Sequence, residues 1–449
     1  MIQQATPILP EPAGLASRIY RPQSAQTFQL ESGASNSRRW PDPLSKDALL
    51  ELAGDIVRRI APETESDLVA LLFQFLNCFG NAVGPGPHFM QERTRHTARQ
   101  FVALVGKSAK ARKGTSWDII KAIFEEADEN WFRKCRASGL GSGEGLVNRV
   151  RDPRESFDEG GNRSVIEGAP DKRLLVNESE LASVLSVSGR EGSTLSEVLR
   201  NAWDSGDLQL TTRNNPLSAT GAHISVIGHI TVEELRKRLA DNDLFNGFAN
   251  RFLWLLVKRT RLLPDGGNLT DDDFSDMGFQ VSNAIDRARK IGRMYRSSEA
   301  RELWRTEYAR LSDDRPGRFG AVTSRAEAQV LRLSITYALL DGSEQIQVQH
   351  LRAALECWRY CQESALYIWG DGLDNATAET IRKALSRAGL RGLSLTEINT
   401  HLGRHTSSKE IRAALQCLVE YGLAEAVPSE RHAVGRRSTY FRIVPRCAN

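Results

Sequence analysis

Short runs of apolar, often β-branched residues alternate with helical or glycine-rich segments over residues 99–265. These runs are "RQFVALVG" (99–106), "RLLVNE" (173–178), "HISVIGHI" (223–230) and "RFLWLLVK" (251–258). Runs of this kind predict buried strands, and strands that alternate with helices predict a mostly parallel sheet with helices on both faces. The fold class expected from this pattern is α/β.

The segments around this core differ from it in composition. Residues 1–44 are rich in Pro, Ser, Gln and Asn and predict a disordered arm. Residues 45–98 show helical spacing and end in a first strand, and residues 266–370 predict a helical domain. Residues 378–449 predict three helices followed by two strands, with a plausible linker before them.

The overall composition sets limits on the partners and on the location of the chain. Lys and Arg number 60 and Asp and Glu 56, so the net charge of +4 permits a polyanionic partner without requiring one. The apolar stretches are too short to span a bilayer, and the beginning of the sequence has no signal-peptide pattern. The six scattered cysteines fit reduced thiols. We therefore expect a cytoplasmic protein without membrane contact.

The segment that follows the first core strand has the layout of a phosphate-binding loop. The strand ends at Gly106, and a helix is predicted to begin at Lys113. The loop is one residue longer than the usual G-x-x-x-x-G-K-[ST] spacing and lacks the second glycine. Such a loop presents backbone N–H groups and a helix N-terminus to phosphate oxygens. The alternative is a basic turn between a strand and a helix.

We predict that ATP and Mg²⁺ bind at this loop. Lys113 would reach the β- and γ-phosphates, and the Mg²⁺ hydroxyl would come from Thr115, with Ser116 as the alternative. The other residues predicted to bind the nucleotide are Gly106, Arg112 and Gly114.

An NTPase also needs carboxylates near the metal and near the attacking water. Glu178 ends the strand 173–178 and is the predicted metal-side acid, with Glu180 as a less favoured choice. A solvated helix cap is the competing interpretation for both. Glu144 lies among four glycines in "GLGSGEG", where backbone can approach a ligand closely. A flexible turn explains that segment equally well.

Several longer stretches carry a family resemblance. They include "SGEGLVNRVRDP" (142–153), "ATGAHISVIGHIT" (219–231) and "LFNGFANRFLW" (244–254). Over residues 45–370 the chain resembles a family of RecA-like P-loop ATPases that plasmids, phages and integrated elements encode, often beside primase-polymerase modules. The wider similarity is to RecA-fold hexameric replicative helicases.

The resemblance implies roles for individual residues. Glu144 would activate water, and His229 would be the polar sensor at the end of a strand, with Thr231 as a second candidate. Arg251 would be an arginine finger that reaches the site of a neighbouring subunit in a homo-oligomer, expected to be a hexamer. The plainer alternatives are a buried core histidine for His229 and a packing or salt-bridge residue for Arg251.

Two loops are expected to contact single-stranded DNA in the channel of such a ring. Residues 187–196 contain Arg190 and residues 209–222 contain Arg213, which suit phosphate contacts. Ordinary surface loops have a similar composition, so this expectation depends on the resemblance.

The C-terminal segment has the pattern of a winged helix-turn-helix domain. Residues 393–403 and 407–427 supply two helices joined by a short turn and the start of a strand. The tip between the last two strands is basic through Arg431, Arg436 and Arg437. A basic wing favours DNA binding, although winged helices also dock proteins.

Three functions are compatible with these features. The first is an ATP-driven DNA motor that acts in the replication of a mobile element. The alternative is a nucleotide-gated DNA-binding or loader protein that does not unwind DNA. A nucleotide kinase is suggested by Lys-Gly-Thr but opposed by the winged helix. No primase or nuclease motif is found in the sequence, so a priming partner would be a separate chain.

Overall fold

The structure of the 449-residue chain is a computed structural model. It describes residues 39–157, 163–211, 216–315, 317–370, 376–403, 406–420, 423–428 and 439–444. Among these residues, no helix combines the length and the apolar composition that crossing a membrane requires.

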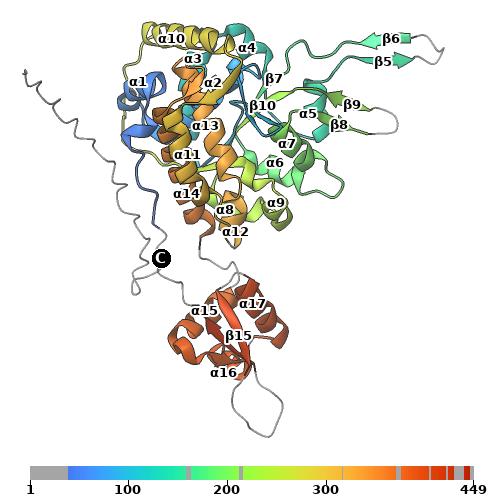
Figure 1. Cartoon of the computed structure of the whole chain (residues 1–449), viewed down its shortest axis with the longest axis vertical. Coiled ribbons are helices and arrows are strands. Elements are labelled where there is room, and N and C mark those ends of the chain that lie inside the picture. The colour runs from blue at the N-terminus through green and yellow to red at the C-terminus, as the bar shows by residue number, and fades with distance from the viewer. Residues whose placement is uncertain are drawn as a thin grey trace, which may run out of the picture. The chain divides into compact units, whose positions relative to one another are not determined.

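A five-stranded sheet with all strands parallel forms the centre of the fold (Figure 1). Its strands are β3 (Phe101–Val105), β4 (Arg136–Ala137), β7 (Arg173–Glu178), β10 (His223–Ile230) and β11 (Phe252–Leu256). The order across the sheet is β11-β3-β10-β7-β4. The predicted α/β fold is confirmed at this level, and the sheet is consistent with a Rossmann-like or RecA-like core.

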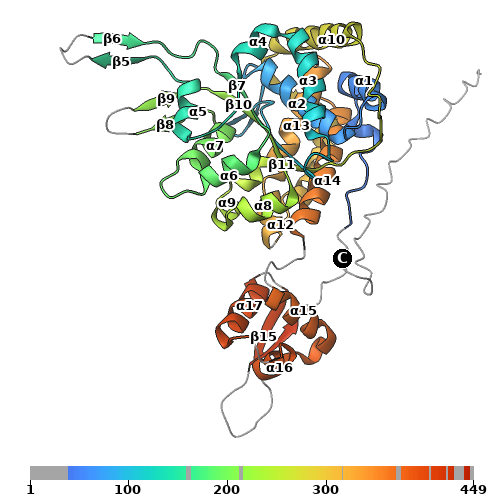
Figure 2. The ribbon, with the colours of Figure 1, turned by 180° about the vertical axis from the view of Figure 1, so that it is seen from behind.

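Helices cover both faces of this sheet (Figure 2). On one face lie α1 (Glu51–Ile60), α2 (Leu68–Val83), α3 (Lys113–Ala127), α4 (Glu129–Lys134), α10 (Asp271–Arg289), α11 (Ser298–Leu311), α13 (Ala326–Leu340) and most of α14 (Val348–Trp369). On the other lie α5 (Gly143–Arg149), α6 (Leu181–Ser188), α7 (Leu195–Asp204), α8 (Val232–Arg238), α9 (Asp241–Phe245) and α12 (Gly317–Thr323).

The two covered faces explain why the strands are mostly apolar. In β3, Val102 and Leu104 belong to the core on the α2 side, whereas Phe101, Ala103 and Val105 belong to the core on the α7 side. Successive side chains of a strand point to opposite faces, so a strand covered on both sides has no solvent-facing position.

The strand order creates a switch point beside β3. From β3 the chain passes to β4 at one edge of the sheet, whereas from the neighbouring β10 it passes to β11 at the other edge. In open α/β sheets, ligands bind outside the carboxyl ends of the strands at such a point. The loop that follows β3 therefore begins where a ligand site is expected.

A polar stripe on the otherwise apolar α2 fastens this helix to the sheet. Gln74, Asn77 and Asn81 are fully buried on one face of α2. The Asn77 amide donates to the carbonyl oxygens of Gln100 and Val226, at 3.3 and 2.9 Å. The Asn81 amide does the same to carbonyls of β7 and β10, at 3.1 and 3.0 Å. These bonds fix the position of α2 across three strands.

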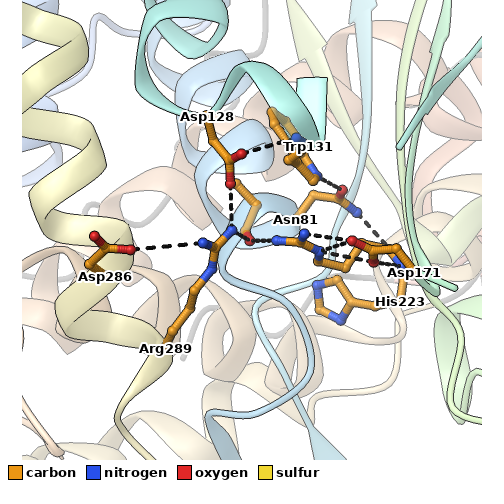
Figure 3. A network of polar contacts seen from close by, with 9 residues as sticks. Asn81, Asp128, Trp131, Asp171, His223, Asp286 and Arg289 are labelled. Carbon is orange, nitrogen blue, oxygen red and sulfur yellow. Dashed lines mark hydrogen bonds and ion pairs between the residues drawn. The ribbon is translucent and has the colours of Figure 1, made fainter. Parts of the chain in front are cut away.

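A second polar network lies at the C-terminal end of α2 (Figure 3). The indole of Trp131 donates to Asn81 at 3.1 Å, and Asp128 accepts from the backbone N–H of Trp131 at 3.0 Å. Arg289 of α10 donates to Asp128 at 2.7 Å and to the carbonyl oxygen of Ala82 at 2.9 Å. The network joins α2, α4 and α10, so it holds α10 against the helices that cover the central sheet.

A small second sheet, of order β13-β12-β1-β2, lies outside the central one. Its strands are β1 (His88–Gln91), β2 (Thr94–His96), β12 (Arg293–Arg296) and β13 (Gln345–Ile346). Residues 266–370 are thus not helical throughout, and α10, α11, α13 and most of α14 share one hydrophobic core with α2 and α3. Strands as short as β12 and β13 carry too few residues for their periodicity to stand out.

Two antiparallel hairpins were also not predicted. They are β5 (Arg154–Phe157) with β6 (Arg163–Ile166), and β8 (Leu208–Leu210) with β9 (Leu217–Ala219). The second hairpin falls in the segment 209–222, which was expected to be a loop. Its Arg213 lies outside the described residues.

The predicted arm, residues 1–44, is described only from residue 39 onward. The ring of Trp40 lies 5.5 Å from that of Tyr367, and the N–H of Asp42 donates to Glu363 at 2.9 Å. Residues 40–44 are therefore packed on α14, because α14 offers both an aromatic and a carboxylate partner.

The C-terminal residues have a hydrophobic cluster of their own. The elements are α15 (Ala376–Ala388), β14 (Leu393–Ser394), α16 (Leu395–His401), α17 (Ser408–Glu420), β15 (Ala424–Pro428) and β16 (Thr439–Ile443). The three strands form an antiparallel sheet of order β14-β16-β15, in which the short β14 was not predicted. Arg431, Arg436 and Arg437 lie outside the described residues.

Candidate functional site

The carboxyl edge of the central sheet brings three of the predicted site residues together. Glu178 at the end of β7 lies opposite Gly228 of β10, and His229 follows directly. The N–H of Gly106 donates to the carbonyl oxygen of Ile230 at 3.0 Å. Because β3, β7 and β10 are parallel neighbours, these residues lie along one edge.

Gly106 is required by the packing of the loop. A Cβ atom at this position would lie 2.4 Å from the carbonyl oxygen of Val257 and 2.9 Å from the Cβ of Ala111. The chain after β11 thus approaches the loop too closely for any side chain. Gly114 has no such constraint, because no atom lies within 4 Å of the corresponding Cβ position.

The N-terminus of α3 is open to a ligand. The helix begins at Lys113, and the preceding residue Arg112 is in the left-handed region, with φ +53° and no side-chain cap. Loop residues 107–110 are exposed. The ammonium of Lys113 donates to the carbonyl oxygens of Gly106 and Lys107, at 2.7 and 3.3 Å. Exposed N–H groups, the positive helix end and a lysine together favour an anion.

The charge of Lys113 is poorly compensated within the chain. Burial lowers the pKa of Lys113 to about 8, and the carboxylates of Glu234 and Glu233 on α8 raise it only in part. These two acids were missed by the motif search, although they follow β10 directly in "HITVEE". A bound phosphate would supply the missing negative charge.

The two candidate Mg²⁺ hydroxyls differ in accessibility. Thr115 is exposed in the first turn of α3. Ser116 is fully buried, and its hydroxyl donates to the carbonyl oxygen of Lys113 at 2.8 Å. The structure therefore favours Thr115 over Ser116 as a metal ligand.

The acidic candidates are arranged around the glycine-rich segment. The carboxylate of Glu178, 6% exposed, accepts from the N–H of Leu140 at 2.8 Å and also from that of Gly139. Burial raises the pKa of Glu178, and these hydrogen bonds oppose the rise. Glu144 is exposed in the first turn of α5, and Glu180 is exposed just before α6. The segment predicted to carry the water-activating acid thus contacts Glu178 through its backbone.

His229 is buried beside the phosphate loop. Its Nε2 lies 3.1 Å from the amide nitrogen of Gln74, a partner supplied by α2. Burial, and secondly the charge of Lys113, lower the pKa of His229 to about 4, so its imidazole is neutral near pH 7. The single polar residue in "LLFQFL" could have indicated Gln74. The second sensor candidate, Thr231, caps α8, where its hydroxyl pairs with Glu234 at 2.9 Å.

Arg251 is held inside its own chain. It is 5% exposed and directly precedes β11. Its guanidinium binds the carboxylate of Asp204 and the carbonyl oxygen of Gly247, and lies 5.7 Å from the ring of Trp203. An arginine finger must reach out of its own subunit, so these contacts favour the salt-bridge role for Arg251.

Arg112 is restrained by the segment before α2. Its Nε donates to the Glu65 carboxylate at 2.6 Å, and its carbonyl oxygen accepts from the Ser66 hydroxyl at 3.3 Å. The predicted DNA contact Arg190 lies exposed between α6 and α7. Among the described residues, no hydrogen bond joins the side chain of Arg112 or Arg190 to that of Lys113.

The described residues contain no group of three or more His, Cys, Asp or Glu that could hold a metal ion. Mg²⁺ does not need one, because it binds through one or two carboxylates together with substrate phosphates. In this chain, Thr115 and Glu178 are the residues that would bind Mg²⁺ together with the phosphates.

No protein-family model matches the chain, and no curated protein matches it. The resemblance to RecA-like ATPases therefore depends on the sequence motifs alone.

Proposed function

We propose that this chain is a RecA-like ATPase that uses MgATP to act as a motor on DNA. The observation that carries the proposal is the uncapped N-terminus of α3, with Lys113 in its first position, directly after β3 at the switch point of the sheet. A helix N-terminus at a switch point is a site for phosphate groups. Among the described residues, the Lys113 ammonium contacts two loop carbonyl oxygens and is compensated only in part by Glu234 and Glu233.

The residues of the carboxyl edge supply the parts that phosphoryl transfer needs. Lys113 would neutralise the β- and γ-phosphates, and Thr115 and Glu178 would hold Mg²⁺. The Gln74 amide donates to Nε2 of the neutral His229, so Nδ1–H of His229 can donate a single hydrogen bond near the γ-phosphate. Glu144, exposed in the first turn of α5, remains our choice for the acid that polarises water.

The C-terminal elements support a DNA partner. The order helix, strand, helix, helix, strand, strand is that of a winged helix, in which the third helix, here α17, enters the major groove. We propose that this domain contacts duplex DNA and that the loops around Arg190 and Arg213 contact a single strand. A homo-hexamer would place these loops around one channel, and a separate primase could supply primers.

A second function is favoured by one observation. Because Arg251 is bound to Asp204 of its own chain, no described residue is established as a finger for the neighbouring site. A nucleotide-gated DNA-binding or loader protein needs nucleotide binding but not rapid turnover, so it can function without an arginine finger.

The nucleotide site is tested by titrating MgATP into the full chain by calorimetry. Lys113→Ala should weaken binding at least about a hundredfold, because a charge-assisted contact to phosphate contributes on the order of 3 kcal/mol. Lys121→Ala, which removes the same charge two turns further along α3, should bind as the wild type does. Equal affinity of Lys113→Ala and wild type would refute the phosphate loop.

The choice between motor and loader depends on a second measurement on the same proteins. A motor should hydrolyse ATP faster with single-stranded DNA and separate a forked duplex. A loader should change its DNA affinity between ATP and ADP without strand separation. Glu144→Gln and Glu178→Gln should each reduce hydrolysis by roughly a hundredfold if they perform the proposed roles.

A further inference from the structure

A cavity of about 460 Å³ lies away from the phosphate loop. It is bounded by β1 and β2, by the short helix Ala249–Arg251 before β11, by α11 and by the first turn of α13. The residues used below are His96, Asn250, Trp304, Tyr308, Arg325 and Glu327. A volume of this size falls within the range of small-molecule sites.

The cavity lies toward the opposite edge of the sheet from the phosphate loop. Asn250 lies two residues before the start of β11, and His96 precedes β3 by a few residues. Both are therefore near the amino ends of parallel strands whose carboxyl ends carry the candidate active site. A ligand here would be a second ligand, and its binding does not depend on the proposed ATPase function.

An excess of positive charge surrounds the cavity. Arg325 is the N-cap of the 15-residue helix α13, and its guanidinium lies 3.3 Å from the carboxylate of Asp204. The buried Arg251 binds the same carboxylate. Arg99 and Arg332, also buried, bind only backbone carbonyl oxygens nearby. Two guanidinium groups thus share the Asp204 carboxylate, and two more are held nearby by carbonyl oxygens, which carry only partial charge.

A fifth arginine adds to this charge behind an aromatic wall. The guanidinium of Arg296 lies 4.1 Å from the ring centre of Trp304 and 4.5 Å from that of Phe89. Its Nε and Nη2 are buried and have no hydrogen-bond partner among the described residues. The arginines also lower the pKa of His96 to about 3, after burial, so His96 cannot add a competing positive charge.

Two buried polar side chains of the cavity wall are incompletely satisfied. His96 is 8% exposed and Asn250 9%. In the described part of the chain, Nδ1 of His96 and Oδ1 of Asn250 have no partner. Leaving a buried polar atom unpaired costs free energy, so such atoms indicate a site that is completed by a ligand or by water.

The cavity also has a surface for a planar ring. The rings of Trp304 and Tyr308 on α11 are 5.6 Å apart, and Tyr308 is 43% exposed. Aromatic side chains at such sites stack on nucleobases. Glu327 is the acidic residue of the wall, and its carboxylate can accept a hydrogen bond from an exocyclic amino group such as that of adenine.

We propose that this cavity binds a nucleotide unit as a second site, with the phosphate at Arg325 and the N-terminus of α13 and the base against Tyr308. The unit can come from a free nucleoside monophosphate or from a nucleic-acid strand. Both sources share a phosphate and an aromatic base, which are the two chemical groups that the wall accommodates.

The test titrates AMP, inorganic phosphate and a short oligodeoxyadenylate into the full chain. Arg325→Gln should weaken binding of every phosphate-bearing probe by about tenfold or more, since a hydrogen bond to a charged group is lost. Tyr308→Ala should weaken binding of AMP and the oligonucleotide several-fold but leave phosphate unchanged. The control Arg305→Gln removes an exposed arginine of α11 that pairs with Glu302 and should change nothing.

The outcomes separate the ligand sources and the two sites. Tight AMP binding assigns the cavity to free nucleotides, whereas binding of the oligonucleotide alone, with the same dependence on Arg325 and Tyr308, assigns it to a strand. Lys113→Ala should retain AMP binding here even if ATP binding at the phosphate loop is lost. The proposal is overturned if no probe binds at millimolar concentration, or if folded Arg325→Gln and Tyr308→Ala bind all probes as the wild type does.

Discussion

The N-terminus of α3 and the C-terminus of α7 both gather cations, but under opposite electrostatic conditions. At the end of α7, Arg332 and Arg99 donate to the carbonyl oxygens of Trp203 and Asp204, at 2.8 and 2.7 Å. A helix C-terminus carries partial negative charge and stabilises cations, whereas an N-terminus destabilises them. Lys113 lies at the N-terminus of α3, where the helix itself opposes its charge.

The difference distinguishes structural cations from cations that face a ligand. The arginines around α7 are buried, and the carbonyl groups and Asp204 that they bind belong to the same chain, so they hold the fold together. Lys113 is only half-buried, and its ammonium reaches no nearer partner than two loop carbonyls. The N-termini of α8 and α3 also differ in whether a side chain satisfies their N–H groups. Thr231 and Glu234 cap α8, whereas no side chain caps α3.

The largest expected effect tests the structural side of this comparison. Arg251→Ala should lower the free energy of unfolding by about 2 kcal/mol, because it removes a buried guanidinium from its ion pair with the part-exposed Asp204 and leaves Asp204 with Arg325 alone. Urea unfolding of the full chain measures the loss, and Arg305→Ala provides an exposed control. A variant of wild-type stability that has lost hydrolysis would instead restore Arg251 as an arginine finger.

A smaller effect is expected at the capped helix. Thr231→Ala should reduce stability by about 1 kcal/mol through loss of the capping box at α8. Thr231→Ser keeps the hydroxyl and should stay close to wild type in the same unfolding measurement. If ATP hydrolysis falls in Thr231→Ala while stability does not, the sensor role belongs to Thr231 and the cap is incidental.

The smallest effect has the opposite sign and concerns Lys113. Without nucleotide, Lys113→Met should raise the free energy of unfolding at pH 7 by at least about 0.5 kcal/mol, because it removes a charge that is disfavoured first by burial and then by the helix N-terminus. The folded pKa, about 8, lies below the ordinary 10.5, so the cost of the charge is complete below pH 8. The gain should therefore disappear as the pH rises from 8 to 10.5. A stability loss at pH 7 would make Lys113 a structural residue.

The central strands were predictable because their pattern is local. The runs 173–178 and 223–230 match β7 and β10 to the residue, since strands buried on both faces are rich in apolar residues. The two-residue strand β4 and the hairpins β5–β6 and β8–β9 were not found, because short or half-exposed strands lack that continuous pattern. The position of the loop after β3 was found from its order between a strand and a helix.

The residues of the candidate site also fall into two groups, those that the sequence indicated and those that it did not. Glu178 was chosen from its place at a strand end, Lys113 from the strand–loop–helix order and His229 from the family resemblance, and parallel pairing brings Glu178 and His229 to one edge. Gln74, Glu233 and Glu234 were missed, because each reaches the site from a helix whose packing no motif encodes.

The sequence by itself determined the α/β class, the strand–loop–helix order around Lys113 and the apolar core positions, because these follow from patterns over a few neighbouring residues. Only the tertiary structure decided the strand order, the burial of Arg251 against Asp204 and the cavity beside Arg325. Those features join residues that are tens to hundreds of positions apart. Such contacts depend on how helices pack across the sheet, and no local pattern specifies that packing.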